Sequence, residues 1–130
     1  MALLESSFLI DVMRNKQPAL ELLDSLEHRE PALFVATPSI MELWAGALLS
    51  NRPDGEQRKI EELLDSLESA PLDAASAKRS AEVWTELSRK GVVIEAIDTM
   101  IAGIALSRGE TVVTRDEHYA RVQGLKVLKY

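Results

Sequence analysis

Four acidic residues stand where carboxylates can carry out chemistry, at the ends of expected strands or the starts of expected helices: Glu5, Glu42, Asp98 and Asp116. Carboxylates that meet in one pocket repel each other unless cations neutralise them. One or two Mg²⁺ or Mn²⁺ ions suit an all-oxygen set of ligands. Two such ions about 4 Å apart can activate water and stabilise the leaving oxygen of a phosphodiester, which is the chemistry that the four acids together favour.

Each acid also has a purely structural interpretation. Asp98 and Asp116 can serve as N-caps of helices, and Glu42 completes a capping-box pattern with Ser39. Glu5 by itself is an acid at the end of a strand. The hypothesis of a metal site therefore rests on the four acids together, because all of them fall at the same end of the inferred sheet.

The segment from residue 97 to residue 119 indicates how two of the acids are positioned. Its isoleucines recur with helical spacing, and a basic last turn ends at Gly109. Residues 111–114 form a short β-branched run, which is typical of a buried strand. A helix that packs back on a parallel strand places Asp98 and Asp116 near one edge of a sheet.

The rest of the chain predicts more strands alternating with helices. Strands are expected at Ala2–Leu4, Leu33–Ala36, Pro71–Leu72 and Lys126–Leu128, and helices after Ser6, at Pro18–His28, from Thr37, across Ile60–Leu67 and at Ala74–Lys90. This alternation predicts an α/β fold, a three-layer α/β/α sandwich with a central, mainly parallel sheet. At this length, residues 1–130 are expected to form one domain.

Two further expectations concern surfaces and cores. Asn51–Gly55 is expected to be a surface loop. Ala77, Ala81, Trp84 and Leu87 are spaced as the apolar stripe of the helix at 74–90. Trp44 and Trp84 are accordingly interpreted as core residues rather than as platforms for stacked bases.

Composition excludes several classes of site. The chain has no cysteine and two histidines, so disulfides are excluded and a structural zinc site is not expected. Its net charge of −6 argues against a broad basic surface for nucleic acid, but not against a local site where metal ions carry the positive charge. The N-terminus has no signal-peptide pattern and no apolar run approaches membrane-spanning length, so a cytoplasmic protein without membrane contact is expected.

Four segments, in this order along the chain, resemble the PIN-domain family, and within it the VapC-type toxins of toxin–antitoxin pairs. They are Leu4–Asp11, Thr37–Leu43, Ile97–Ala102 and Val113–Tyr119, and Gly124–Val127 resembles the last strand of the family. The resemblance implies a PIN-like fold and a Mg²⁺-dependent endoribonuclease that cleaves RNA. It also implies a protein that is usually a homodimer and is held inactive by a cognate antitoxin.

The resemblance also assigns roles to individual residues. The acidic set of the family maps onto Glu5, Glu42, Asp98 and Asp116, and Ser7 and Thr114 fall where hydroxyls support the metal ligands. In this assignment Glu5, Asp98 and Asp116 hold Mg²⁺ or Mn²⁺. Glu42 orients or deprotonates the attacking water, directly or through the metal.

Two positions depart from the pattern of the family. The family usually has Asp where this chain has Glu5, and the extra methylene moves the carboxylate by about 1.5 Å. Because Mg²⁺ requires near-ideal octahedral geometry, we expect Glu5 to lower activity without abolishing it. His118 stands where some relatives carry another acid, which favours one bound ion over two.

Three functions compete. A metal-dependent ribonuclease needs local cations for its substrate, and Arg14, Arg52 and Arg115 are the candidates, although each can equally be solvated surface. A degenerate PIN domain that binds a protein partner or RNA without cleavage is favoured by Glu5. A receiver-like domain ranks lower, because no Asp follows the strand at 33–36.

The expected partners follow from the resemblance and the charge. An acidic toxin suits an antitoxin that inserts a basic residue near the carboxylates and so keeps metal or RNA out. The leucine-rich helices at Pro18–His28 and Glu56–Glu68 are candidate surfaces for the homodimer, but their leucines can equally be core.

Overall fold

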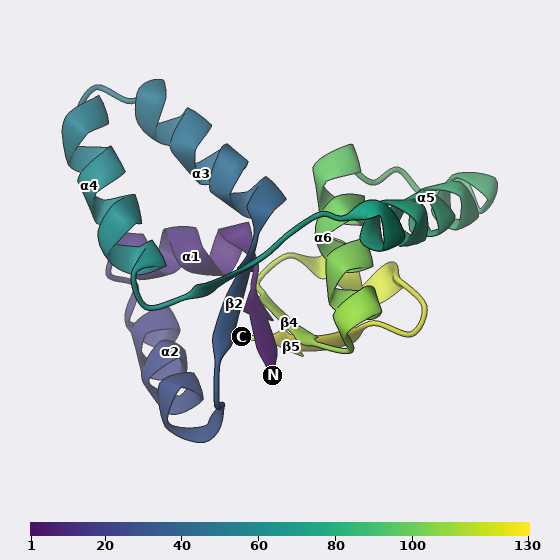
Figure 1. The fold of residues 1–130 in the computed structure, drawn as a ribbon, viewed down its shortest axis with the longest axis horizontal. Coiled ribbons are helices and arrows are strands. Elements are labelled where there is room, and N and C mark those ends of the chain that lie inside the picture. Colours follow the sequence, from purple (N-terminus) through teal and green to yellow (C-terminus); the bar gives the residue numbers. More distant parts are fainter.

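The computed structural model describes residues 1–130 and has a five-stranded sheet covered by helices on both faces (Figure 1). The strands are β1 (Ala2–Leu4), β2 (Leu33–Ala36), β3 (Glu68–Ala70), β4 (Thr111–Thr114) and β5 (Lys126–Lys129). The helices are α1 (Ser6–Met13), α2 (Gln17–Arg29), α3 (Thr37–Leu48), α4 (Pro53–Leu64), α5 (Ala74–Arg89), α6 (Ala96–Arg108) and the 3₁₀ turn η1 (Glu117–Arg121). The strand order is β3-β2-β1-β4-β5 and every pairing is parallel, so the predicted α/β/α fold is confirmed.

Two hydrophobic cores lie on opposite faces of this sheet. Because side chains alternate along a strand, Leu3 and Phe34 face one core while Leu4 and Val35 face the other. Helices α5 and α6 close the first core, and α1 to α4 close the second (Figure 1). The three interior strands, β2, β1 and β4, are buried on both faces, which explains their nearly continuous apolar and β-branched sequence.

The register of the sheet fixes where the acids emerge. Leu4 at the end of β1 pairs with Val113 of β4, and the backbone N–H of Glu5 donates to the carbonyl of Val113 at 3.0 Å. Chain segments that leave the carboxyl ends of β1, β2 and β4 therefore meet at one edge. In open α/β sheets this edge is where functional groups gather.

The predicted bounds of two elements, β3 and α4, are wrong. The third strand is Glu68–Ala70 and not Pro71–Leu72, since proline has no N–H for the ladder and this exposed edge strand carries no apolar signal. Pro53 does not belong to a loop but begins α4, which ends at Leu64 rather than Leu67. Proline fits the first turn of a helix, and Asp54 and Glu56 favour the helix dipole there.

The predicted apolar stripe of α5 is correct at Leu87 and wrong at Ala77, Ala81 and Trp84. The buried residues of α5 are Ser76, Ser80, Val83 and Leu87, whereas Ala77 and Ala81 are exposed and Trp84 is 43% exposed. The reason is the close approach of α6, on which a Cβ at Gly103 would lie only 2.1 Å from Ser80 Oγ. Small serines fit this contact, and Ser80 satisfies its hydroxyl on the carbonyl of Ser76. No helix of the chain combines the length and apolarity needed to cross a membrane.

Candidate active site

An open hollow of about 480 Å³ lies at the carboxyl edge of the sheet and is lined by all four predicted acids. Its walls come from α1, α3, the start of α6 and the loop after β4. The lining residues are Glu5, Ser6, Ser7, Ile10, Arg14, Glu42, Val93, Ile94, Glu95, Asp98, Arg115, Asp116 and His118. The structure thus brings together four acids that are up to 111 positions apart in the chain (5 to 116).

Glu5 is held tightly at the N-terminus of α1. Its side chain is only 4% exposed and accepts hydrogen bonds from the backbone N–H of Ser7 at 3.0 Å and from Ser7 Oγ at 2.6 Å. Thr114 Oγ1 also donates to the carboxylate, at 2.5 Å. The two hydroxyls that the resemblance selects, Ser7 and Thr114, therefore both contact Glu5.

Glu42 lies in the second turn of α3 and points across to α1. Ser6 Oγ donates to its carboxylate at 2.7 Å. The capping-box interpretation is wrong, because Ala36 is the N-cap and Ser39 lies inside α3 with a buried hydroxyl that has no partner. Burial raises the pKa of Glu42, the bond from Ser6 opposes this, and the nearby carboxylate of Glu5 adds to the rise.

Asp98 is the acid of the hollow whose pKa is raised most. It lies in the first turn of α6 but is not the N-cap, a position that Glu95 occupies. Burial, and then the charges of Asp116, Glu5 and Glu42, raise the pKa of Asp98 to about 6, against a hydrogen bond that Tyr119 donates at 3.1 Å. A carboxyl group that titrates this close to neutral pH is typical of functional sites.

Asp116 both caps η1 and lines the acidic hollow. Its Oδ1 accepts from the backbone N–H of His118 at 2.9 Å, so it caps η1 as the structural interpretation predicts. It also lines the hollow and raises the pKa of Asp98. The capping interpretation is thus correct for Asp116 and wrong for Asp98.

The donor set of the hollow suits a hard divalent cation in its chemistry. None of the four acids pairs with an arginine or a lysine, and their mutual repulsion contributes to the raised pKa values of Asp98 and Glu42. His118 Nε2, 3.8 Å from Asp116 Oδ1, is the one basic side chain that pairs with these acids. Carboxylate oxygens are the ligands that Mg²⁺ and Mn²⁺ prefer. With the side chains as they stand, no three acids converge on one point, so an ion requires side-chain rotation or bridging water.

Sequence reasoning missed one buried acid next to the hollow. Asp11 accepts from Arg115 Nε at 2.8 Å and from the hydroxyl of Tyr130 at 2.6 Å. Burial acts to raise the pKa of Asp11, but these two hydrogen bonds and the charge of Arg115 outweigh it and lower the pKa. The available signal was an acid inside the apolar run of residues 8–13.

The three predicted cations lie in different settings. Arg115 lines the hollow but is committed to Asp11. Arg14 lines the hollow and is exposed. Arg52 does not line it, because it stands at the N-cap of α4, and the expectation that it lies at the edge of the site is wrong.

Comparisons with known proteins agree with this geometry. The family model described as "PIN domain" matches residues 2–125. The chain is 29% identical over 125 residues to a "tRNA(fMet)-specific endonuclease VapC" from Shigella flexneri, covering 95% of this chain and 93% of the relative. It is 32% identical to a protein of the same name from Salmonella typhimurium over 96 residues, 73% of each chain. The crystal structure of VapBC2 from Rickettsia felis, bound to a DNA fragment from their promoter, superposes with a TM-score of 0.92 at 22% identity over 99% of this chain and 98% of that one.

Proposed function

We propose that this chain, which belongs to the PIN domain family and within it to the VapC group, is a metal-dependent endoribonuclease. The observation that carries the proposal is the set of four carboxylates that line one hollow without any arginine or lysine partner. The endonuclease names of the two curated relatives support it. We further propose that residues 1–130 act as one domain, and that the reaction takes place in the cytoplasm, where cellular RNA is available.

The proposed roles follow the contacts of each acid. Glu5, Asp98 and Asp116 would hold Mg²⁺ or Mn²⁺, which when bound supplies neutralising charge and lowers the pKa of water. Glu42, whose pKa is raised by burial, accepts the proton of the attacking water. The Ser7 and Thr114 hydroxyls fix the carboxylate of Glu5, and the Tyr119 hydroxyl fixes that of Asp98.

The experiment is cleavage of labelled RNA by the purified chain in Mg²⁺, in Mn²⁺ and in EDTA. Because two relatives are named for tRNA(fMet), a transcript of that tRNA belongs in the panel beside an unrelated structured RNA. Asp98→Asn is the control for contaminating nucleases, since it keeps the size of the side chain and an acceptor for Tyr119. We expect metal-dependent cleavage that this substitution removes.

A second candidate function has an observation in its favour. The carboxylate of Glu5 already accepts three hydrogen bonds from Ser7 and Thr114, which leaves it less able to bind an ion than a freely exposed acid. A PIN domain weakened in this way binds RNA or a protein partner without cleavage. Folded, antitoxin-free protein that cuts nothing in any metal would favour this alternative.

We propose an antitoxin as the regulatory partner. The similar structure from Rickettsia felis is a VapBC2 assembly on DNA, which supports a two-protein system. Because the four acids have no arginine or lysine partner within the chain, the hollow suits a partner protein that inserts such a residue between the carboxylates. Replacing the basic residues of the antitoxin should release ribonuclease activity from the complex, and no release would contradict this part of the proposal.

We propose that two copies of the chain pair through α3 and α5 rather than through the leucine-rich helices. The leucines of α2 and α4 pack against the core, which leaves little apolar surface there. In contrast, Met41 and Leu48 of α3 are 55% and 57% exposed, beside a strongly apolar depression of about 460 Å³. Trp84 of α5 is exposed as well, beside a second apolar depression against α6. A self-complementary pair of such patches is typical of a two-fold dimer.

A further inference from the structure

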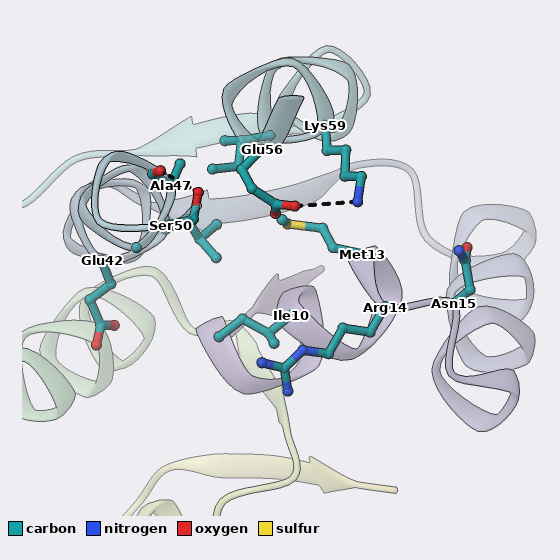
Figure 2. A pocket seen from close by; sticks show the side chains of 12 residues that line it. Ile10, Met13, Arg14, Asn15, Glu42, Ala47, Ser50, Glu56 and Lys59 are labelled. Atoms are coloured by element: carbon teal, nitrogen blue, oxygen red, sulfur yellow. Dashed lines mark hydrogen bonds and ion pairs between the residues drawn. The ribbon is translucent and has the colours of Figure 1, made fainter. Parts of the chain in front are cut away.

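A second depression opens beside the acidic hollow and continues away from it. It has a volume of about 610 Å³ and lies between the end of α1 and the pair formed by α3 and α4 (Figure 2). It shares three lining residues with the acidic hollow, Ile10, Arg14 and Glu42, so the two spaces have a common wall. We refer to this second depression as the side groove.

The side groove is lined by both apolar and charged side chains, which suits a ligand with a charged backbone and flat apolar groups such as bases. Ile10 and Met13 are partly exposed and give apolar surface, and the buried Leu43 and Ile60 lie behind it. Gly46 leaves part of the α3 wall bare, with no atom within 4 Å of the place where a Cβ would stand. Lys59 lies on the α4 side, paired with Glu56 at 3.4 Å (Figure 2).

Arg14 is the free cation at the junction of the two spaces. Its guanidinium makes no ion pair and no side-chain hydrogen bond within the chain, unlike Arg115, which is bound to Asp11. Figure 2 shows its side chain extending from the end of α1 past Ile10, on the side of the groove toward Glu42. A planar, permanently charged guanidinium of this kind is well suited to a phosphate.

Position decides which anion this arginine should contact. An RNA whose reacting phosphate lies among the four acids must continue along the surface, and the side groove adjoins the acids through Arg14 and Glu42. The neighbouring phosphate then meets a cation that is not already neutralised, which offsets repulsion by the acids. The apolar walls of the groove provide surface for bases.

We propose that Arg14 binds a backbone phosphate of the RNA and that the side groove holds the strand as it leaves the acidic hollow. The inference rests on the proposed ribonuclease function and assigns the substrate path of that same site. It makes Arg14 a substrate-binding residue, and it excludes Arg52 from that role.

The test is the affinity of the chain for a 5′-fluorescein-labelled single-stranded RNA, measured by anisotropy in Mg²⁺ at several salt concentrations. All variants carry Asp98→Asn so that the probe is not cut. Arg14→Ala removes the charge, and Gly46→Leu fills the groove at a helical position with open space. Arg52→Ala, at the N-cap of α4, is the control for Arg14→Ala, and Gly55→Leu, within α4, is the control for Gly46→Leu. Neither Arg52 nor Gly55 lines the side groove.

We expect Arg14→Ala to weaken binding by roughly tenfold, the effect of one charge-assisted hydrogen bond. The slope of log affinity against log salt should fall by about 0.7, as for the loss of one phosphate contact on a single strand. Gly46→Leu should weaken binding and leave the salt slope unchanged, because it adds bulk and removes no charge. Both controls should bind as the parent does.

The failure of this inference can be told apart from failure of the proposed function. If the parent chain cleaves RNA but Arg14→Ala and Gly46→Leu bind the probe with parental affinity and slope, the substrate path is wrong and Arg14 is left to a protein partner. A loss of binding equal in Arg14→Ala and Arg52→Ala would also overturn it, since it would report charge in general. A chain that neither binds nor cleaves any RNA contradicts the proposed function itself.

Discussion

The acidic hollow depends on hydroxyl groups as much as on acids. Ser7 and Thr114 donate to Glu5, Ser6 donates to Glu42, and Tyr119 donates to Asp98. The bonds to Glu42 and Asp98 act to lower the pKa of these two carboxyl groups, and so oppose the rise that burial and the neighbouring charges cause. These donors orient the acids before any ligand binds.

At Glu5, a shorter side chain tests the cost of the extra methylene. The Glu5→Asp variant brings the carboxylate back by about one bond length and makes it a preferred helix N-cap for α1. We expect the variant to cleave RNA faster and to need less Mg²⁺, because the shorter side chain removes the displacement of the carboxylate and Mg²⁺ requires near-ideal octahedral geometry. Single-turnover cleavage across a Mg²⁺ titration measures both quantities, and unchanged values would show that the methylene has no effect.

At Asp98, repulsion predicts how the stability of the metal-free chain depends on pH. Its pKa is about 6 in the folded chain against an ordinary value of 3.8, so the folded state holds this proton more tightly than the unfolded state. Stability should therefore fall as the pH rises from about 4 through 6. The Asp98→Asn substitution should remove much of that fall and should stabilise the chain at pH 7 in EDTA.

Urea unfolding at pH 4 and pH 7 gives the measurement for both chains. Asp65→Asn, at an exposed site just after α4, is the control and should leave the pH dependence unchanged. A destabilised Asp98→Asn variant at pH 7 in EDTA would contradict the repulsion described here.

At the scale of elements, the contact between α5 and α6 positions Asp98. Gly103 of α6 approaches α5 so closely that an added Cβ would meet Ser80 Oγ at 2.1 Å, Ser80 N at 2.7 Å and Ser76 O at 2.8 Å. Two of these three atoms belong to the backbone, so the helices themselves would have to separate. The buried serines of α5 and the glycine of α6 are thus one packing feature.

The Gly103→Ala variant should therefore lose about 2–3 kcal/mol or more of unfolding free energy, the cost of overpacking a rigid contact. Adding Ser80→Ala should recover only part of the loss, because the backbone contacts remain. Gly46→Ala is the matched control, and should gain about 0.5–1 kcal/mol in its open helical position. Urea unfolding measures all three, and equal effects of the two alanines would contradict the argument.

At the scale of the whole molecule, the apolar surfaces of α3 and α5 predict self-association. Met41→Lys and Trp84→Lys each place a charge in the proposed interface and should convert a dimer into a monomer, as measured by sedimentation velocity. Leu49→Lys is the control, because Leu49 is 87% exposed and outside both apolar depressions. A parent chain that is monomeric at high concentration would overturn the proposed dimer.

The sequence by itself determined the alternation of strands and helices, the parallel sheet and the edge at which the four acids emerge. These follow from local patterns, since apolar periodicity and helix-terminal residues report on the nearest few positions. They sufficed for β1, β2, β4 and the segment from Ala96 to Thr114, whose burial matches their composition.

Tertiary structure decided what local patterns cannot encode. The buried face of α5 carries serines and not the predicted alanines, because Gly103 of α6 lies against it. Asp11 is buried because Arg115 and Tyr130, more than 100 positions away, bind it. The different settings of Arg14, Arg52 and Arg115 were likewise fixed only when the helices packed. In each case the deciding contact joins residues distant in the chain, so no pattern of neighbouring residues could reveal it.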